Sequence, residues 1–130
     1  MRGPGGRHDL ADVISLLRAE PASKRAVVTL CGRGDEKVPC INVLQFLVRA
    51  GAVRTIYFAR GQDAFKKFYA DALCLAKMAR RVAEGLSLPA GTVSGLIGSS
   101  HVYREDRPAI DEFLARGNRF RRNAQLEGVR

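Results

Sequence analysis

The chain has 130 residues, of which 46% are hydrophobic, and this length and composition are typical of one globular domain. No apolar run approaches the ~20 residues of a membrane-spanning helix, and the basic segment at positions 1–7 lacks the apolar run of a signal peptide. We therefore expect a cytoplasmic protein with no membrane partner. The net charge of +9, from 22 Lys and Arg against 13 Asp and Glu, favours an anionic partner such as a nucleotide, an acidic cofactor or nucleic acid. Three cysteines without a Cys-x-x-Cys spacing argue against a metal site or a disulfide framework.

The first predicted elements are one helix and three strands. Hydrophobic spacing predicts an amphipathic helix over residues 8–20, which Pro21 ends. A strand is expected over residues 26–31. The nearly continuous apolar segment over residues 40–48, with Asn42 and Gln45 inserted, is typical of a strand buried on both faces. Ala50 and Gly51 then predict a turn into a strand over residues 53–59, so the last two strands should form a hairpin.

The second half of the chain predicts a long helix, another strand and a short helix. The period is helical over residues 62–86, with Gly85 as a stop. A strand is expected over residues 92–103, and a helix over residues 109–116 that ends before Gly117. The order α-β-β-β-α-β-α indicates an α+β fold, a single layered domain over residues 1–130 with its core at about residues 24–116 and basic tails at both ends.

Several residues whose side chains could take part in binding or catalysis lie at or near the ends of these elements. In chain order they are Lys24, Arg25, Cys40 after Pro39, Gln45 before Phe46, Arg60, Asp63, Asp71, His101 and Tyr103. In kind and spacing they resemble the thymidylate synthases and the related cytidylate hydroxymethylases. The intervals that separate Cys40, Arg60, Asp71 and His101 match the pattern of that family without a gap. The resemblance implies a thymidylate synthase-like sheet packed against helices.

The resemblance also implies a role for each residue at the site. Cys40 would be the nucleophile that adds to C6 of a pyrimidine ring, and Arg60 would favour its thiolate form and bind the substrate phosphate. Asp63 would orient the ring through its backbone, while His101 and Tyr103 would bind the sugar hydroxyl. The one-carbon donor would be 5,10-methylenetetrahydrofolate.

A homodimer follows from the same resemblance. Lys24 and Arg25 would reach across the dimer interface to the phosphate site of the other subunit, and Gln45 would belong to the substrate site. Apolar strand residues are expected in the interface, namely Val43, Leu47, Ile56 and Phe58.

Asp71 predicts which base is bound. The thymidylate branch has Asn at this position, and a carboxyl group instead can accept a hydrogen bond from the cytosine 4-amino group. Asp at this position resembles the hydroxymethylase branch, in which water quenches the exocyclic methylene intermediate. The substrate predicted by the resemblance is therefore a cytidine nucleotide monophosphate, and the reaction a hydroxymethylase-like C5 transfer.

Several positions depart from the family pattern. Gly61 stands in place of a phosphate-binding Ser, Lys67 and Tyr69 replace Gly and Pro, and Ile41 replaces a frequent His. The segment before Cys40 is too short for the family's large amino-terminal portion, which carries a catalytic Glu. One alternative is therefore a non-catalytic nucleotide-binding homologue, or a subunit completed by a separate partner chain. A basic nucleic-acid-binding module is a third possibility, supported by charge alone.

The remaining side chains near these motifs are expected to be structural. The other cysteines and the aromatic residues beside the long helix should lie in the core, namely Cys31, Cys74, Phe58, Phe65, Phe68 and Tyr69. The lysines of the long helix should form a solvated face, namely Lys66, Lys67 and Lys77.

Overall fold

The computed structural model describes residues 9–32, 34 and 36–127, and side chains as far as residue 117. The elements, in chain order, are α1 (Leu10–Ala19), β1 (Val27–Thr29), β2 (Ile41–Arg49), β3 (Ala52–Ala59), β4 (Gln62–Asp63), α2 (Phe68–Gly85), β5 (Ala90–Ile97), β6 (Ser100–His101), the 3-10 turn η1 (Arg104–Asp106) and α3 (Arg107–Glu127). The predicted α+β class is confirmed, with two short strands and a 3-10 turn added to the expected order.

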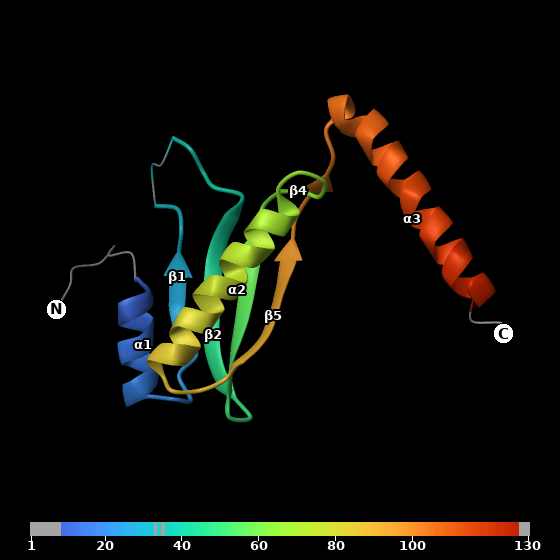
Figure 1. Ribbon diagram of the computed structural model, residues 1–130. Helices are drawn as coiled ribbons and strands as arrows, with labels where there is room; N and C mark the ends of the chain where they lie inside the picture. Colours follow the sequence, from blue (N-terminus) through green and yellow to red (C-terminus); the bar gives the residue numbers. More distant parts are fainter. Residues whose placement is uncertain (1–8, 33, 35, 128–130) are drawn as a thin grey trace.

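The central sheet has the strand order β1-β2-β3-β5. β2 and β3 form the predicted antiparallel hairpin, and its turn residues Ala50 and Gly51 have φ values of 51° and 73°, as a type I′ turn requires. β3 and β5 are parallel, and α2 connects their ends across one face of the sheet (Figure 1). β4 and β6 form a separate parallel pair, which extends the carboxyl ends of β3 and β5.

The core lies between this sheet face and the helices α1 and α2. Leu44, Phe46 and Val53 of the sheet are fully buried and belong to one cluster with Leu17 of α1 and Val82 of α2. Burial of such side chains is the main favourable term in folding. Two helices and a sheet therefore form a two-layer arrangement (Figure 1).

The opposite face of the sheet is open, which corrects the prediction that the strand over residues 40–48 is buried on both faces. Burial in β2 alternates, because every second residue turns away from the helices. Val43 pairs with Phe58 across the hairpin, and Gln45 pairs with Ile56. Ile56 and Phe58 are 42% and 40% exposed.

Three elements differ from their predicted bounds by more than a few residues. α2 begins at Phe68 rather than near Gln62, because the Asp63 carboxylate accepts hydrogen bonds from the backbone N–H groups of Phe65 (3.1 Å) and Lys66 (3.0 Å) and so stabilises a turn there. The strand expected over residues 92–103 is interrupted after Ile97 and ends at His101, so Tyr103 lies outside it. α3 continues through Gly117 to Glu127, since glycine weakens a helix by only about 1 kcal/mol.

The expectation that several aromatic residues and Cys74 lie in the core is wrong. Phe68 and Tyr69 are 44% and 74% exposed, and Cys74 is exposed. The buried stripe of α2 runs through Leu75, Ala79, Val82 and Ala83, and one helical face of this width leaves the neighbouring positions in solvent.

α3 leads away from the sheet (Figure 1) and begins directly after η1. Within the described residues, none of the helices combines the length and the apolar character needed to span a lipid bilayer.

Candidate functional site

Three successive carbonyl groups hold the segment before β2, two of them bonded to Arg60 directly after β3 and one to Asn42 in β2. The carbonyl of Val38 accepts from Arg60 Nη2 (2.8 Å), that of Pro39 from Asn42 Nδ2 (2.9 Å), and that of Cys40 from the Arg60 backbone N–H (2.9 Å). These bonds bring Cys40 and Arg60 together as predicted, although the whole β2–β3 hairpin separates them in the sequence. Cys40 is half-buried, whereas the Arg60 side chain is exposed.

Asn42 is the buried centre of this arrangement. The register between β2 and β3 shifts between Ile41 and Val43, so Asn42 is the extra residue of a β-bulge, a feature that commonly re-aims side chains beside functional sites. Its side chain is 7% exposed, and its Oδ1 accepts from the Arg60 N–H at 3.2 Å. The sequence carries a signal for this residue, because Asn42 interrupts an apolar strand, but that signal alone predicts no role for it.

A hollow of about 320 Å3 opens beside Cys40, and it is lined by Leu30, Pro39, Cys40, Ile41, Lys67 and Asp71. Its volume is in the range of small-molecule sites. The structure therefore places the predicted nucleophile and the predicted base-reading residue in the lining of one hollow. Lys67, expected on a solvated face, also lines the hollow, because it is the N-cap residue of α2.

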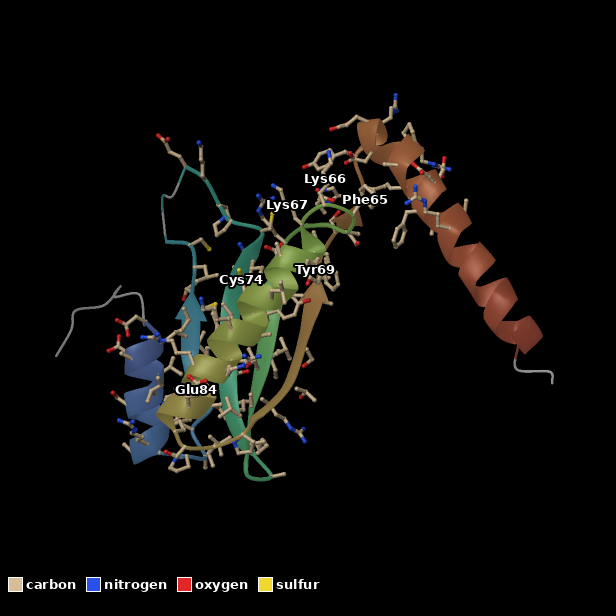
Figure 2. All side chains as sticks on the ribbon, viewed as in Figure 1. Phe65, Lys66, Lys67, Tyr69, Cys74 and Glu84 are labelled. Carbon is tan, nitrogen blue, oxygen red and sulfur yellow. The ribbon has the colours of Figure 1, made fainter. Side chains whose placement is uncertain are left out.

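Lys66 and Lys67 are neighbours at the start of α2 (Figure 2) but face different surroundings. The ammonium of Lys66 lies 2.6 Å from a carboxylate oxygen of the buried Asp106. This hydrogen bond is the main reason why the pKa of Lys66 is raised. Lys66 therefore fastens the α2 start to η1 and leaves Lys67 as the lysine at the Cys40 pocket.

Asp71 is held from outside the pocket by a residue that the sequence pattern does not single out. Gln62 Nε2 donates to Asp71 Oδ2 at 2.8 Å, and Gln62 is only 2% exposed. A buried polar side chain needs a hydrogen-bond partner, and Asp71 satisfies this need.

Asp63, His101 and Tyr103 form a neighbouring group rather than part of the same lining. Asp63 is paired with His101 between β4 and β6, and the rings of His101 and Tyr103 meet edge to face with centroids 5.3 Å apart. The pKa of Asp63 is lowered, first by the N–H of Lys66 and further by the N–H of Phe65 and by electrostatic interactions with His101 and Lys66, against the opposing effect of burial.

Lys24, Arg25 and Gln45 are not brought to the Cys40 pocket within one chain. Gln45 Nε2 donates to the Lys24 carbonyl at 2.7 Å, and Arg25 forms a 2.6 Å ion pair with Glu20. All of them lie around the start of β1, whereas Cys40 precedes β2 and therefore lies at the other end of this antiparallel strand pair.

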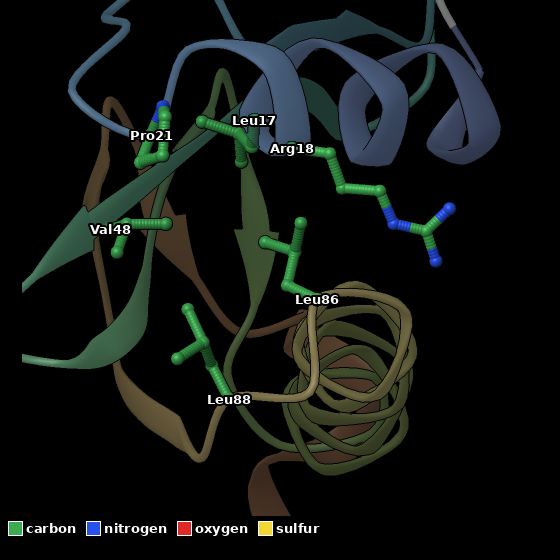
Figure 3. Close-up of a pocket in the computed structure, with 6 residues that line it drawn as sticks. All are labelled: Leu17, Arg18, Pro21, Val48, Leu86 and Leu88. Carbon is green, nitrogen blue, oxygen red and sulfur yellow. The ribbon is translucent and has the colours of Figure 1, made fainter.

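A second hollow, of about 370 Å3, lies between α1, β2 and the segment after α2 (Figure 3). It is lined by Leu17, Arg18, Pro21, Val48, Leu86 and Leu88. The charged member of this lining is Arg18, and its guanidinium already donates to the Gly85 carbonyl at 2.6 and 3.1 Å. Among the described residues that line this hollow, none therefore offers a free polar side chain that would orient a nucleotide.

Metal ligation has no candidate in the part of the chain that the structure describes, since no three His, Cys, Asp or Glu side chains are grouped there. The described side chains that line the Cys40 pocket offer a thiol, one ammonium group and a carboxylate.

Comparison with known proteins gives one consistent family. The family model described as Thymidylate synthase matches residues 4–128. A putative thymidylate synthase of Methanosarcina barkeri is 29% identical over 119 residues, which cover 88% of this chain and 55% of that protein. The thymidylate synthase of Rhizorhabdus wittichii is 26% identical over 118 residues, covering 88% of this chain and 38% of that protein.

A thymidylate synthase of Listeria monocytogenes is 25% identical over 111 residues, which cover 82% of this chain and 35% of that protein. The chain thus spans about half the length of the archaeal relative and little more than a third of the bacterial ones. The family model covers all of the described residues, including those that line the Cys40 pocket. The chain belongs to the thymidylate synthase family.

Proposed function

We propose that this chain carries the nucleophile and the base-reading residue of a pyrimidine nucleotide C5-transferase that acts on a cytidine monophosphate. The observation that carries the proposal is that Cys40 and Asp71, which are distant in the sequence, line one pocket. A thiol and a carboxylate that line one pocket can engage two different positions of a flat heterocycle at the same time. Lys67 lines the same pocket, and its positive charge favours an anionic substrate.

The chemistry begins with nucleophilic addition. The Cys40 thiolate forms a bond to C6 of the pyrimidine, and the electron pair of the C5–C6 double bond moves to C5, which becomes nucleophilic. C5 then takes a proton from water, loses its original hydrogen as a proton, and returns the electron pair as the sulfur–C6 bond breaks. This sequence exchanges the C5 hydrogen without any further reactant, and in a full reaction a one-carbon unit takes the place of the incoming proton.

Base preference follows from the hydrogen-bonding pattern of Asp71. An ionised carboxylate only accepts hydrogen bonds, so it pairs with the amino group of cytosine. The uracil oxygen at the same ring position would set two acceptors against each other. A buried mismatch of this kind costs on the order of 1–3 kcal/mol, which corresponds to at least a severalfold difference in affinity.

Methylenetetrahydrofolate is the one-carbon donor normally used by the family, and when bound it would supply the carbon that is joined to C5. The described pocket does not fit it together with a nucleotide. Six residues line a single hollow of about 320 Å3, which is at the lower end of the range for one small-molecule site. The proposal therefore includes no step through folate.

A homodimer through the open face of the sheet is part of the proposal. Val43, Leu47, Ile56 and Phe58 lie on this face by their register, and a stable interface needs an apolar centre of this kind. Sedimentation at micromolar concentration should show twice the 14.2 kDa chain mass. A purely monomeric species would contradict the dimer.

The function is tested by hydrogen exchange at C5. CMP labelled with tritium at C5 should release tritium into water when the protein is added. Cys40→Ala should abolish the release, whereas Cys74→Ala is the matched control, because Cys74 is exposed on α2, and should leave it unchanged.

Nucleotide binding is measured in parallel by calorimetry with CMP and UMP. The unmutated protein should prefer CMP, and Asp71→Asn should narrow or reverse the preference, since an amide can also donate. Equal affinities in the unmutated protein would show that Asp71 does not read the base. Absence of both exchange and binding would overturn the proposed function.

A further inference from the structure

Gln62 is a buried amide in direct contact with the wall of the Cys40 pocket. Its backbone is fixed by strand pairing of β4 with β6 and by its N–H, which donates to the Ser99 carbonyl at 2.8 Å. The side chain reaches from β4 to α2 and ends 2.8 Å from Asp71 Oδ2. The side chain that reaches Asp71 thus starts from a paired strand rather than from a mobile loop.

The chemistry of the contact sets its direction. A carboxylate oxygen accepts, so the nitrogen and not the oxygen of the Gln62 amide must face Asp71. This bond occupies Oδ2 and restricts rotation of the carboxylate. Asp71 also lines the pocket with Cys40, where its second oxygen is left as an acceptor.

We infer that Gln62 is the positioning residue that fixes the Asp71 carboxylate as an acceptor beside Cys40, and so makes the pocket selective for a base that presents an amino group. The inference rests on the proposed function, which supplies the bound pyrimidine. It assigns base selection to a pair of residues, Gln62 and Asp71, rather than to Asp71 alone. Gln62 acts only through Asp71 and does not line the pocket itself.

The test is a double-mutant cycle on nucleotide preference. Four proteins are compared by calorimetry with CMP and UMP, namely the unmutated chain, Gln62→Leu, Asp71→Ala and the double variant. Leucine keeps most of the volume of Gln62 but removes the donor. The unmutated chain should prefer CMP about tenfold, and Gln62→Leu should lose most of this preference. In the Asp71→Ala background, Gln62→Leu should leave the ratio of the two affinities unchanged.

A purely structural role gives a different result. If Gln62 only stabilises the fold, Gln62→Leu weakens the binding of CMP and of UMP equally and leaves the ratio of the two affinities unchanged. This result overturns the inference, while the proposed function stands. The inference is also overturned if Gln62→Leu changes the ratio of the CMP and UMP affinities as much in the Asp71→Ala background as in the unmutated chain, since Gln62 would then act by another route.

Denaturant unfolding of the same four proteins gives a readout that needs no nucleotide. The losses in unfolding free energy from Gln62→Leu and Asp71→Ala should not add, because each change removes the same hydrogen bond. Additive losses overturn the pairing. Failure of the unmutated chain to bind either nucleotide overturns the proposed function and base selection together, and unfolding then decides whether Gln62 holds Asp71.

Discussion

Replacing Asn42 by alanine should loosen the segment that carries Cys40. The change removes the 2.9 Å bond to the Pro39 carbonyl and the 3.2 Å bond from the Arg60 N–H. The Arg60 N–H keeps its 2.9 Å bond to the Cys40 carbonyl, whereas the Pro39 carbonyl and the Cys31 sulfur, which lies 3.9 Å from Asn42 Nδ2, lose the Asn42 side chain as a donor. Each lost bond contributes about 1 kcal/mol or less, and the space left at a 7% exposed site adds roughly 1 kcal/mol. The expected loss in unfolding free energy is about 2–3 kcal/mol.

Urea unfolding measures this loss, and Thr55→Val is the matched control. Thr55 is fully buried on the neighbouring strand, and its hydroxyl has no hydrogen-bond partner within the described part of the chain. Valine has nearly the same shape and favours strands, so this variant should be as stable as the unmutated chain or more stable. If Asn42→Ala costs no more than Thr55→Val, the hydrogen bonds of Asn42 do not hold the segment.

Alkylation of the cysteines separates a local effect from a general one. In Asn42→Ala, Cys40 should react faster with iodoacetamide, because the segment that half-buries it is released from Asn42. Cys74, which is already exposed, provides the internal reference. Equal acceleration of both thiols would indicate global unfolding instead.

Three further predictions concern single residues. Gly61→Ser should fold normally, since an added Cβ lies 3.8 Å from its nearest neighbours. Calorimetry should show tighter CMP binding through a new hydrogen bond between the serine hydroxyl and the phosphate. An unchanged affinity for CMP would count against a phosphate at this position. Gly95→Ala should cost about 1–3 kcal/mol in urea unfolding, because its Cβ would overlap the Tyr57 ring; a similar cost in a Tyr57→Ala background would refute this cause. The pKa of Asp63 is lowered, first by the Lys66 N–H. The ionised Asp63 carboxylate therefore stabilises the fold above its usual pKa of 3.8, and this stabilisation is lost as the pH falls through the folded-state pKa. Asp63→Asn should therefore differ most from the unmutated chain near neutral pH, and a difference in unfolding free energy that grows on acidification would contradict the assignment.

Local sequence determined the elements whose signals lie close together along the chain. Ala50 and Gly51 suit a turn with two positive φ values, and this turn sets the β2–β3 hairpin. The apolar spacing of residues 8–20 and Pro21 predict α1, which runs over Leu10–Ala19. The family was also readable from the sequence, because the order and spacing of Cys40, Arg60 and Asp71 are properties of the chain itself.

Tertiary structure decided the features that depend on contacts between distant residues. Gln62 and Asp63 have a helical pattern in the sequence, but they pair with Ser100 and His101 as strands. The pairing of β4 with β6 cannot be read from local periodicity, because α2 and β5 separate the two strands in the sequence and the hydrogen bonds form only when β6 is in place.

The pocket itself shows the same division. Cys40 and Asp71 were predictable candidates from their types and spacing, whereas Lys67 and Gln62 had only the signals of a helix face. The fold brings both to the pocket region, because the helix begins at Phe68 and so leaves Lys67 at its N-cap in the pocket lining and Gln62 on a strand, where it donates to Asp71. The sequence by itself therefore determined which reactive side chains the chain carries, and the packing of α2 against the sheet decided which of them lie together, because such contacts join residues that are distant in the sequence.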